Sequence, residues 1–200
     1  MIRRAVLALA LPLALGGCIS LFPKAPPAQL YTFGTVKPAA TAAAPRFAVL
    51  NGAISFNRMA ATDRILTVSG NEVAYIKSAR WAEPAPLIFH EAEERAFDLA
   101  GGPARLVEVG EASRASNILR LNVLRFEARY DQGMNAAPTV VVRVAASLSK
   151  ASDHSILGDQ VFEAATPASE NRVGAITQAF DQSTAQVLTQ LVAWVGEKGA

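Results

Sequence analysis

The two histidines of the sequence are the first candidates for acid–base or metal chemistry. His90 is followed by Glu94 four residues later, a spacing that would put both side chains on one helix face, where they could bind a metal ion. No third ligand is evident beside them, so we expect a solvated helix face rather than a metal site. His154 stands between an aspartate and a serine, but neighbours on a turn point apart, whereas a catalytic set must converge. We therefore interpret His154 as a turn residue.

The motifs of common enzyme classes are also missing from the sequence. It contains neither a Gly-x-Ser-x-Gly nucleophile motif nor a glycine-rich phosphate loop. We therefore expect no catalytic residue, no bound metal and no cofactor, and we predict that the protein is not an enzyme.

The single cysteine, Cys18, ends a stretch that has the order of a secretory signal. Two arginines are followed by an unbroken apolar run over residues 5–15, and two glycines precede the cysteine. The segment Leu15-Gly16-Gly17-Cys18 resembles the bacterial lipobox, in which a leucine and small residues lead to an invariant cysteine. This resemblance implies cleavage before Cys18, acyl chains such as palmitate on its sulfur and new N-terminus, and a mature protein anchored in a membrane.

Three other interpretations of this stretch are weaker. A transmembrane helix needs about 20 apolar residues, whereas this run is shorter and contains Pro12. A buried core helix would have nothing upstream to cover it. An ordinary cleaved signal would leave Cys18 as a lone thiol in an exported protein, exposed to oxidation or wrong pairing, and acylation removes that liability.

The rest of the chain has the composition of one globular domain. The 200-residue sequence remains long enough, after a short leader, to bury a sizeable core without disulfides. The two leader arginines account for the whole formal charge of +2, because the other basic residues equal the 17 acidic residues in number. Neither a basic cluster nor interleaved aromatic residues occur, so we expect no nucleic-acid partner.

We predict three parts of the chain from these features. Residues 1–17 form the signal peptide, and residues 18–45 form the lipidated N-terminus and a tether rich in proline and alanine. Residues 46–198 form the folded domain. Within the tether, residues 30–33 could make a first short strand.

Alternating apolar residues predict most of the strands. A β-hairpin is predicted for residues 64–69 and 72–79, because Gly70-Asn71 supplies the positive φ of a tight turn. Residues 51–63 give no strong signal and are interpreted as a loop. The other predicted strands cover residues 46–50, 105–109, 139–149 and 156–164.

The strand predicted for residues 117–130 changes phase in its middle. Leu119, Leu121 and Val123 form the apolar set at first, and from Leu124 onward the set lies on the other parity. A one-residue slip turns every later side chain to the opposite face, so a β-bulge near Val123 would explain the change. A strand that leaves one sheet face for another environment explains it equally well.

Two helices complete the prediction. Helical spacing of apolar residues covers residues 87–99, which follow two prolines and precede Gly101-Gly102-Pro103. A second apolar stripe covers residues 169–195, with Ser169 as the expected N-cap. The predicted fold class is α/β (α+β): a mixed, mainly antiparallel sheet packed against two main helices, preceded by a signal peptide and a flexible tether.

Trp81 and its neighbours are the strongest candidates for a partner-binding surface. Trp81 lies between the predicted hairpin and the first helix, after Tyr75 and Arg80. We favour a packing role for Trp81 at the strand-to-helix corner. The alternative is an anchor for a partner, because Trp, Tyr and Arg are enriched at binding hot spots.

Several segments together resemble the ABC-type transport auxiliary lipoproteins. The similar segments are Arg64-Ile65-Leu66, Asn71-Glu72-Val73-Ala74-Tyr75, Ala79-Arg80-Trp81-Ala82, Pro86-Leu87, Ala96-Phe97, Leu121 with Phe126-Glu127-Ala128, and the C-terminal helix. The resemblance covers residues 30–195 and is weakest over residues 52–62.

This resemblance implies a periplasm-facing lipoprotein that helps a lipid-moving ABC system of the mammalian-cell-entry (MCE) type and supports outer-membrane integrity. The implied partners are an MCE-domain protein, an ABC permease and an ATPase, with the membrane bound through acylated Cys18; a homo-oligomer is left open. Ile19 lies where an aspartate would retain a lipoprotein in the inner membrane, so the analogy favours the outer membrane. The main alternative is a structural envelope lipoprotein that moves no lipid, and an exported hydrolase is the least favoured.

Overall fold

The computed structural model describes residues 27–34 and 46–200. The predicted signal peptide, Cys18 and most of the predicted tether lie outside the described residues. The described elements are, in chain order, β1 (Gln29–Tyr31), β2 (Phe47–Phe56), β3 (Arg64–Ser69), β4 (Glu72–Trp81), α2 (Ala85–Ala100), β5 (Ala104–Val107), the 3₁₀ helix η2 (Val109–Arg114), β6 (Asn117–Arg129), β7 (Thr139–Lys150), β8 (Ile156–Pro167) and α3 (Val173–Lys198).

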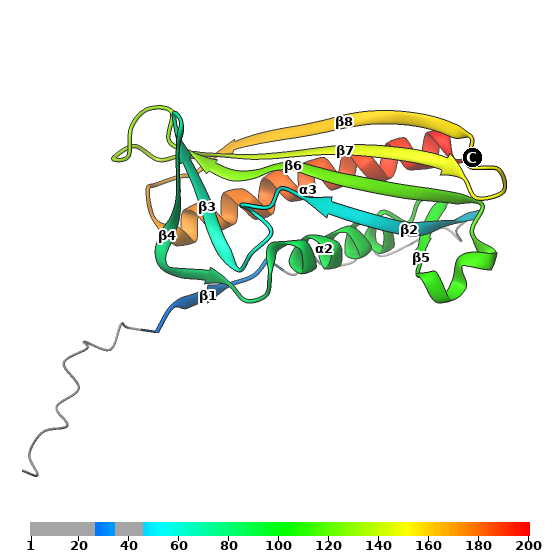
Figure 1. Ribbon diagram of the computed structural model, residues 1–200, viewed down its shortest axis with the longest axis horizontal. Helices are drawn as coiled ribbons and strands as arrows, with labels where there is room; N and C mark the ends of the chain where they lie inside the picture. Colours follow the sequence, from blue (N-terminus) through cyan, green and yellow to red (C-terminus); the bar gives the residue numbers. More distant parts are fainter. Residues whose placement is uncertain (1–26, 35–45) are drawn as a thin grey trace, which may run out of the picture.

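The described strands form one eight-stranded mixed sheet built around β6 (Figure 1). One edge of β6 pairs with β7 along its whole length, and β8 adds a third antiparallel strand. The other edge is shared, because β2 pairs in parallel with the first half of β6 and β3 pairs in parallel near its end. β5 extends the sheet beyond β2, and β4 and β1 extend it beyond β3. The sheet therefore forks beside β6, and the predicted fold class is confirmed.

A β-bulge in β6 lies at this fork, which confirms the bulge interpretation. The register of β6 against β7 shifts between Val123 and Arg125. Buried side chains change parity at the shift: Val123 is buried before it, Phe126 is buried after it, and Leu124 is 37 % exposed. The extra residue thus keeps Val123 before the shift and Phe126 and Ala128 after it on the core side of the sheet, whereas Leu124, the first residue of the second predicted set, is exposed.

The predicted hairpin of β3 and β4 is also confirmed. The two strands are antiparallel, and Val68 pairs with Val73 next to the turn. Gly70 has a φ of +56°, a left-handed conformation that glycine adopts without steric cost.

The loop predicted for residues 51–63 is wrong in its first half, because β2 continues to Phe56. Its register against β6 shifts between Asn51 and Ile54, and this irregularity hides the alternation from sequence reasoning. Gly52 lies at the shift, where a Cβ atom would come 2.4 Å from the carbonyl oxygen of Leu119. The close approach of the two backbones therefore requires glycine.

Most other boundaries differ from the prediction by a few residues, and three differences matter for the fold. β5 ends at Val107, and η2, which was not predicted, follows it. α3 begins at Val173, so Ser169 is not its N-cap; bends occupy residues 169–172, and extended Arg172 precedes the helix without a side-chain cap. β1 (Gln29–Tyr31) confirms the short strand predicted at residues 30–33, with shifted bounds, and it pairs with β4, so this part of the segment assigned to the tether belongs to the sheet.

Both long helices pack on one face of the sheet, with α3 beneath β7 and β8 and α2 beside α3 (Figure 1). α2 begins after Pro84 and ends at Gly101, whose φ of 56° closes the helix in a left-handed conformation. On α3, Phe180, Val187, Leu191 and Val195 are fully buried against the sheet. The expected apolar stripe of the C-terminal helix is therefore confirmed as a core face.

Candidate functional site

Trp81 belongs to the core of the described domain. Its side chain is 1 % exposed. Its ring lies 5.2 Å from that of Phe180 on α3, 5.7 Å from Phe33 and 5.9 Å from Phe126. These edge-to-face and tilted contacts are typical of packed aromatic clusters. The burial favours the packing interpretation, since Trp81 offers a partner almost no surface in this fold.

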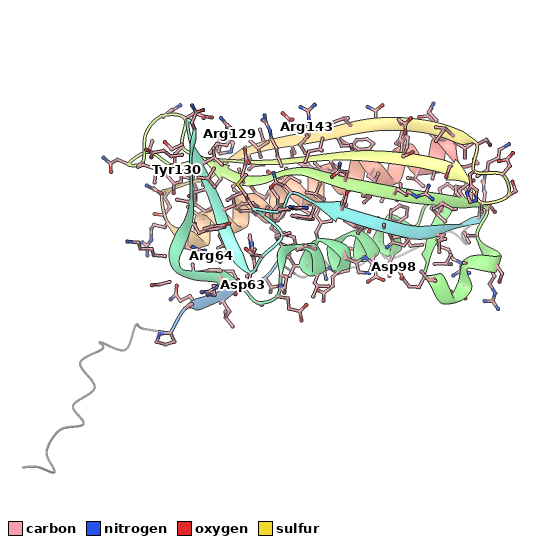
Figure 2. All side chains as sticks on the ribbon, in the orientation of Figure 1. Asp63, Arg64, Asp98, Arg129, Tyr130 and Arg143 are labelled. Carbon is pink, nitrogen blue, oxygen red and sulfur yellow. The ribbon has the colours of Figure 1, made fainter. Side chains whose placement is uncertain are left out.

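Tyr75 and Arg80, predicted with Trp81 as a partner-binding set, have separate local contacts. The Tyr75 hydroxyl donates a hydrogen bond to the Met59 carbonyl oxygen at 3.0 Å, and the Arg64 guanidinium lies 3.7 Å from the ring centroid. Arg80 pairs with the Asp63 carboxylate at 2.8 Å, and both of these side chains are more than 40 % exposed. Figure 2 labels Asp63 and Arg64 beside β1 and β3. The three predicted side chains therefore do not converge on one surface, and partner binding by Tyr75 or Arg80 stays a prediction.

An apolar groove of about 630 Å³ runs between α2 and α3. The α2 wall includes Ala92, Ala96 and Leu99, and the α3 wall includes Leu188 and Val192. The core side of α2 consists of Ala85, Ile88, Phe89, Glu93 and Phe97, all of them buried. Ala92 and Ala96 are only partly buried and pack at the margin of this core.

An acidic crevice lies on the other flank of α2, between this helix and the segment that follows β5. Its carboxylates are Glu91, Glu94, Asp98, Glu108 and Glu111, and the crevice has a volume of about 420 Å³. Figure 2 labels Asp98 beside α2.

Arginines pair with only part of this acidic set. Arg95 lies 3.6 Å from Glu91, and Glu111 is approached by Arg105 at 3.8 Å and Arg114 at 2.7 Å. Among the described residues, Glu94 and Glu108 have no arginine or lysine within salt-bridge distance.

His90 connects this crevice with a buried carboxylate. Its Nε2 atom lies 3.8 Å from a Glu94 oxygen, and its Nδ1 atom lies 3.7 Å from Oε2 of Glu93. The Glu93 side chain is 0 % exposed. Asn51 on β2 donates its amide to Glu93 Oε2 at 3.3 Å, and the same nitrogen lies 3.3 Å from His90 Nδ1. Glu93 Oε1 has no hydrogen-bond partner among the described residues.

The surroundings raise the pKa of both groups. The pKa of His90 is raised mainly by the neighbouring Glu93 carboxylate, and the charges of Glu94 and Glu108 raise it further, whereas desolvation lowers it. The pKa of Glu93 is raised by burial, which outweighs the lowering by His90 and Asn51. The neighbouring carboxylates therefore favour a positive charge at His90, and burial disfavours a negative charge at Glu93.

Sequence reasoning found His90 and Glu94 but missed Asn51, Glu93 and Glu108. Glu108 lies in the turn after β5 and comes near the helix only through the fold. His90, Glu94 and Glu108 can each place one ligand atom within 4.8 Å of the others. The absence of a metal site stays a prediction, but its premise, a missing third ligand, does not hold. A signal existed for Glu93, because it lies four residues from both Phe89 and Phe97 on the core face.

The fold is shared with solved structures of bacterial proteins. A member of the family DUF330 from Xanthomonas campestris is 26% identical, with a TM-score of 0.76 over 86% of this chain and 97% of that chain. A hypothetical protein from Chlamydia trachomatis shares the fold at 10% identity, with a TM-score of 0.53 over 77% of this chain and 98% of that chain. No curated protein matches the sequence.

The family follows from the sequence itself. Residues 31–192 match the family described as the ABC-type transport auxiliary lipoprotein component, and the chain belongs to this family. None of the helices in the described ranges is long and apolar enough to cross a membrane.

Proposed function

We propose that this chain is a lipid-anchored accessory of an MCE-type ABC system that moves lipid between the two membranes of the envelope. In this proposal the domain faces the periplasm, binds a periplasm-spanning partner with an MCE domain, and holds it at the membrane. The permease and ATPase are other subunits. The role is one of binding rather than catalysis.

The observation that carries the proposal is the family match over residues 31–192. It covers nearly all of the described domain, and the family description names a lipoprotein that assists ABC-type transport. The lipobox-like segment ending at Cys18 supplies a means of attachment that the described helices do not. Two or more acyl chains give stable membrane attachment, whereas one gives only marginal attachment.

The proposed location is the outer membrane. Its support is Ile19, which follows Cys18 where an aspartate would favour retention in the inner membrane. Fractionation of the two membranes by density, followed by immunodetection of the chain, tests this location. Recovery of the chain with inner-membrane markers would contradict it.

The central experiment is affinity capture of the tagged chain from detergent-solubilised envelopes, with partners identified by mass spectrometry. We expect an MCE-domain protein to be enriched over an equally tagged, unrelated lipoprotein. Deletion of the gene should sensitise cells to detergents, and the lipidated wild type should restore resistance. Cys18→Ser should restore it poorly, because anchoring sets the effective concentration at the membrane.

Two results would overturn the proposal. Capture of cell-wall or outer-membrane assembly proteins without any transport subunit would favour a structural envelope lipoprotein. Full rescue by a Cys18→Ser chain that is soluble and normally abundant would show that membrane attachment is not needed.

A further inference from the structure

We propose that His90, Glu94 and Glu108 form a binding site for a divalent transition-metal ion of the Zn²⁺ type. The ion would lie in the acidic crevice and link α2 to the turn after β5. One ligand atom from each side chain lies within 4.8 Å of the other two. The Nε2 atom of His90 lies 3.8 Å from a Glu94 oxygen. Tetrahedral Zn²⁺ with bonds of about 2.0–2.1 Å separates its ligand atoms by about 3.3–3.4 Å, so small side-chain rotations would complete the geometry.

A buried carboxylate behind the imidazole supports this assignment independently of the three ligands. Oε2 of Glu93 approaches His90 Nδ1 at 3.7 Å, while Nε2 of the same ring faces Glu94 in the crevice. A metal-ligating histidine usually directs its second ring nitrogen to a carboxylate or carbonyl, which fixes the tautomer and makes the ligand more basic. Glu93 lies on this side of the ring at 3.7 Å, which is longer than a hydrogen bond, and the Asn51 amide nitrogen lies 3.3 Å from Nδ1, so a small rotation of the ring would bring Nδ1 within reach of the carboxylate.

The position of Glu93 has no explanation in packing alone. The side chain is 0 % exposed, lies on the core face of α2 between Phe89 and Phe97, and has an Oε1 atom with no hydrogen-bond partner in the part of the chain that the structure describes. Burial of a carboxylate with incomplete partners is costly. A site in which Glu93 orients the histidine that binds the metal accounts for the burial.

The charges of the crevice favour a cation. Arginines approach Glu91 and Glu111, whereas Glu94 and Glu108 lie beside His90 without such partners. Arg95 also lines the crevice, but five carboxylates outnumber it, and a concave surface with an excess of one sign of charge concentrates ions of the opposite sign. The site therefore has an excess of negative charge at the position of the proposed ion.

The ligand set selects the class of metal. Imidazole nitrogen suits Zn²⁺, copper and nickel, whereas Mg²⁺ and Ca²⁺ prefer sites built from oxygen ligands. Three protein ligands leave one position of a tetrahedral ion open. A water molecule would occupy this fourth position.

The test measures Zn²⁺ binding to the full chain in detergent by isothermal titration calorimetry and by the shift of the melting temperature. All variants carry Cys18→Ser, because a free thiolate is itself a zinc ligand. The test variants are His90→Ala and Glu108→Gln, the second of which changes an exposed side chain. The matched control is Glu91→Gln, which removes the same charge from the same crevice but not from the ligand set.

We expect one Zn²⁺ per chain and a higher melting temperature in its presence. His90→Ala should weaken binding by more than about 100-fold, beyond the 10- to 100-fold usual for an outer-shell residue. Glu108→Gln should weaken it by about tenfold or more, and Glu91→Gln should bind as the parent does. Equal affinity in the parent and His90→Ala, no binding at millimolar Zn²⁺, or an equal melting shift with Mg²⁺ would overturn the assignment.

Discussion

The two flanks of α2 have opposite chemical character although they belong to one helix of 16 residues. Toward α3, small apolar side chains such as Ala92 and Ala96 leave an open groove of about 630 Å³. Toward the turn after β5, Glu94 and the half-exposed His90 face other carboxylates across a crevice. The core face lies between the two flanks and contains Glu93. The difference shows that one helix can serve the core and still present two chemically distinct surfaces.

The largest effect is expected at the aromatic cluster under the groove. Trp81→Ala should lower the free energy of unfolding by about 3–5 kcal/mol, because it leaves a cavity among Phe33, Phe126 and Phe180. Phe33 also lines the groove, so we expect the cavity to distort the groove between α2 and α3 before other parts of the domain. Urea denaturation followed by circular dichroism measures the loss. An unchanged midpoint with lost partner capture would restore the anchor interpretation of Trp81.

A carboxylate placed in the groove should be tolerated less well than those in the crevice. Ala96→Glu should destabilise the domain by about 1–3 kcal/mol, because the new charge loses water against the α3 wall without a hydrogen-bond partner. Gln190→Glu is the matched control on the exposed face of α3, and its effect should stay within about 0.5 kcal/mol. Equal midpoints for the two variants would show that the groove wall is as well solvated as the helix surface.

The crevice flank should make stability depend on pH in a chelator-containing buffer. The folded-state pKa of His90 lies above 6.5, so its contribution is present below pH 6.5 and is lost as pH rises through the folded value. The raised pKa of Glu93 changes stability in the same direction, because stability falls as pH rises above 4.5.

Melting temperatures between pH 4.5 and pH 8.5 check this dependence. Glu93→Gln should flatten the curve, because the neighbouring Glu93 carboxylate is the main cause of the raised pKa of His90. Glu91→Gln should leave its shape unchanged. A melting temperature of the parent protein that rises with pH through this range would contradict the raised pKa values of His90 and Glu93.

The smallest effect is expected next to Trp81 in the sequence. Arg80→Ala should cost about 0.2–1 kcal/mol, since its ion pair with Asp63 is exposed and screened by water. The contrast between Arg80 and Trp81 tests whether β4 separates a solvated face from a core face. A loss of unfolding free energy from Arg80→Ala as large as that from Trp81→Ala would show that the Arg80 side of β4 is not a solvated face.

The sequence predicts those features that depend on neighbouring residues. The hairpin around Gly70, the bulge near Val123 and the two long helices follow from turn chemistry and apolar spacing, and all three are confirmed. The helix boundaries are less certain from sequence, and Ser169 as the N-cap is wrong because a serine before an apolar stripe does not by itself start a helix.

Features that depend on distant parts of the chain could not be predicted in the same way. β2 continues past Gly52 because it pairs with β6, more than 60 residues away in the sequence. Glu108 approaches His90 only because β5 pairs with β2. The candidate metal ligands are therefore partly visible as helix spacing and partly a product of the fold. Lipidation of Cys18 lies outside the described residues and stays a prediction.

The fork beside β6 has a consequence for the order in which the sheet assembles. β6 begins at residue 117, far along the chain from β2 and β3, which pair with its second edge. Without β6, the β3–β4 hairpin and the β2–β5 pair have no common strand to join them. β6, β7 and β8 follow one another in a local meander, which can form quickly because its contacts are close in sequence. We therefore expect the rate-limiting step of folding to be the long-range pairing of β2 and β3 with the free edge of this meander.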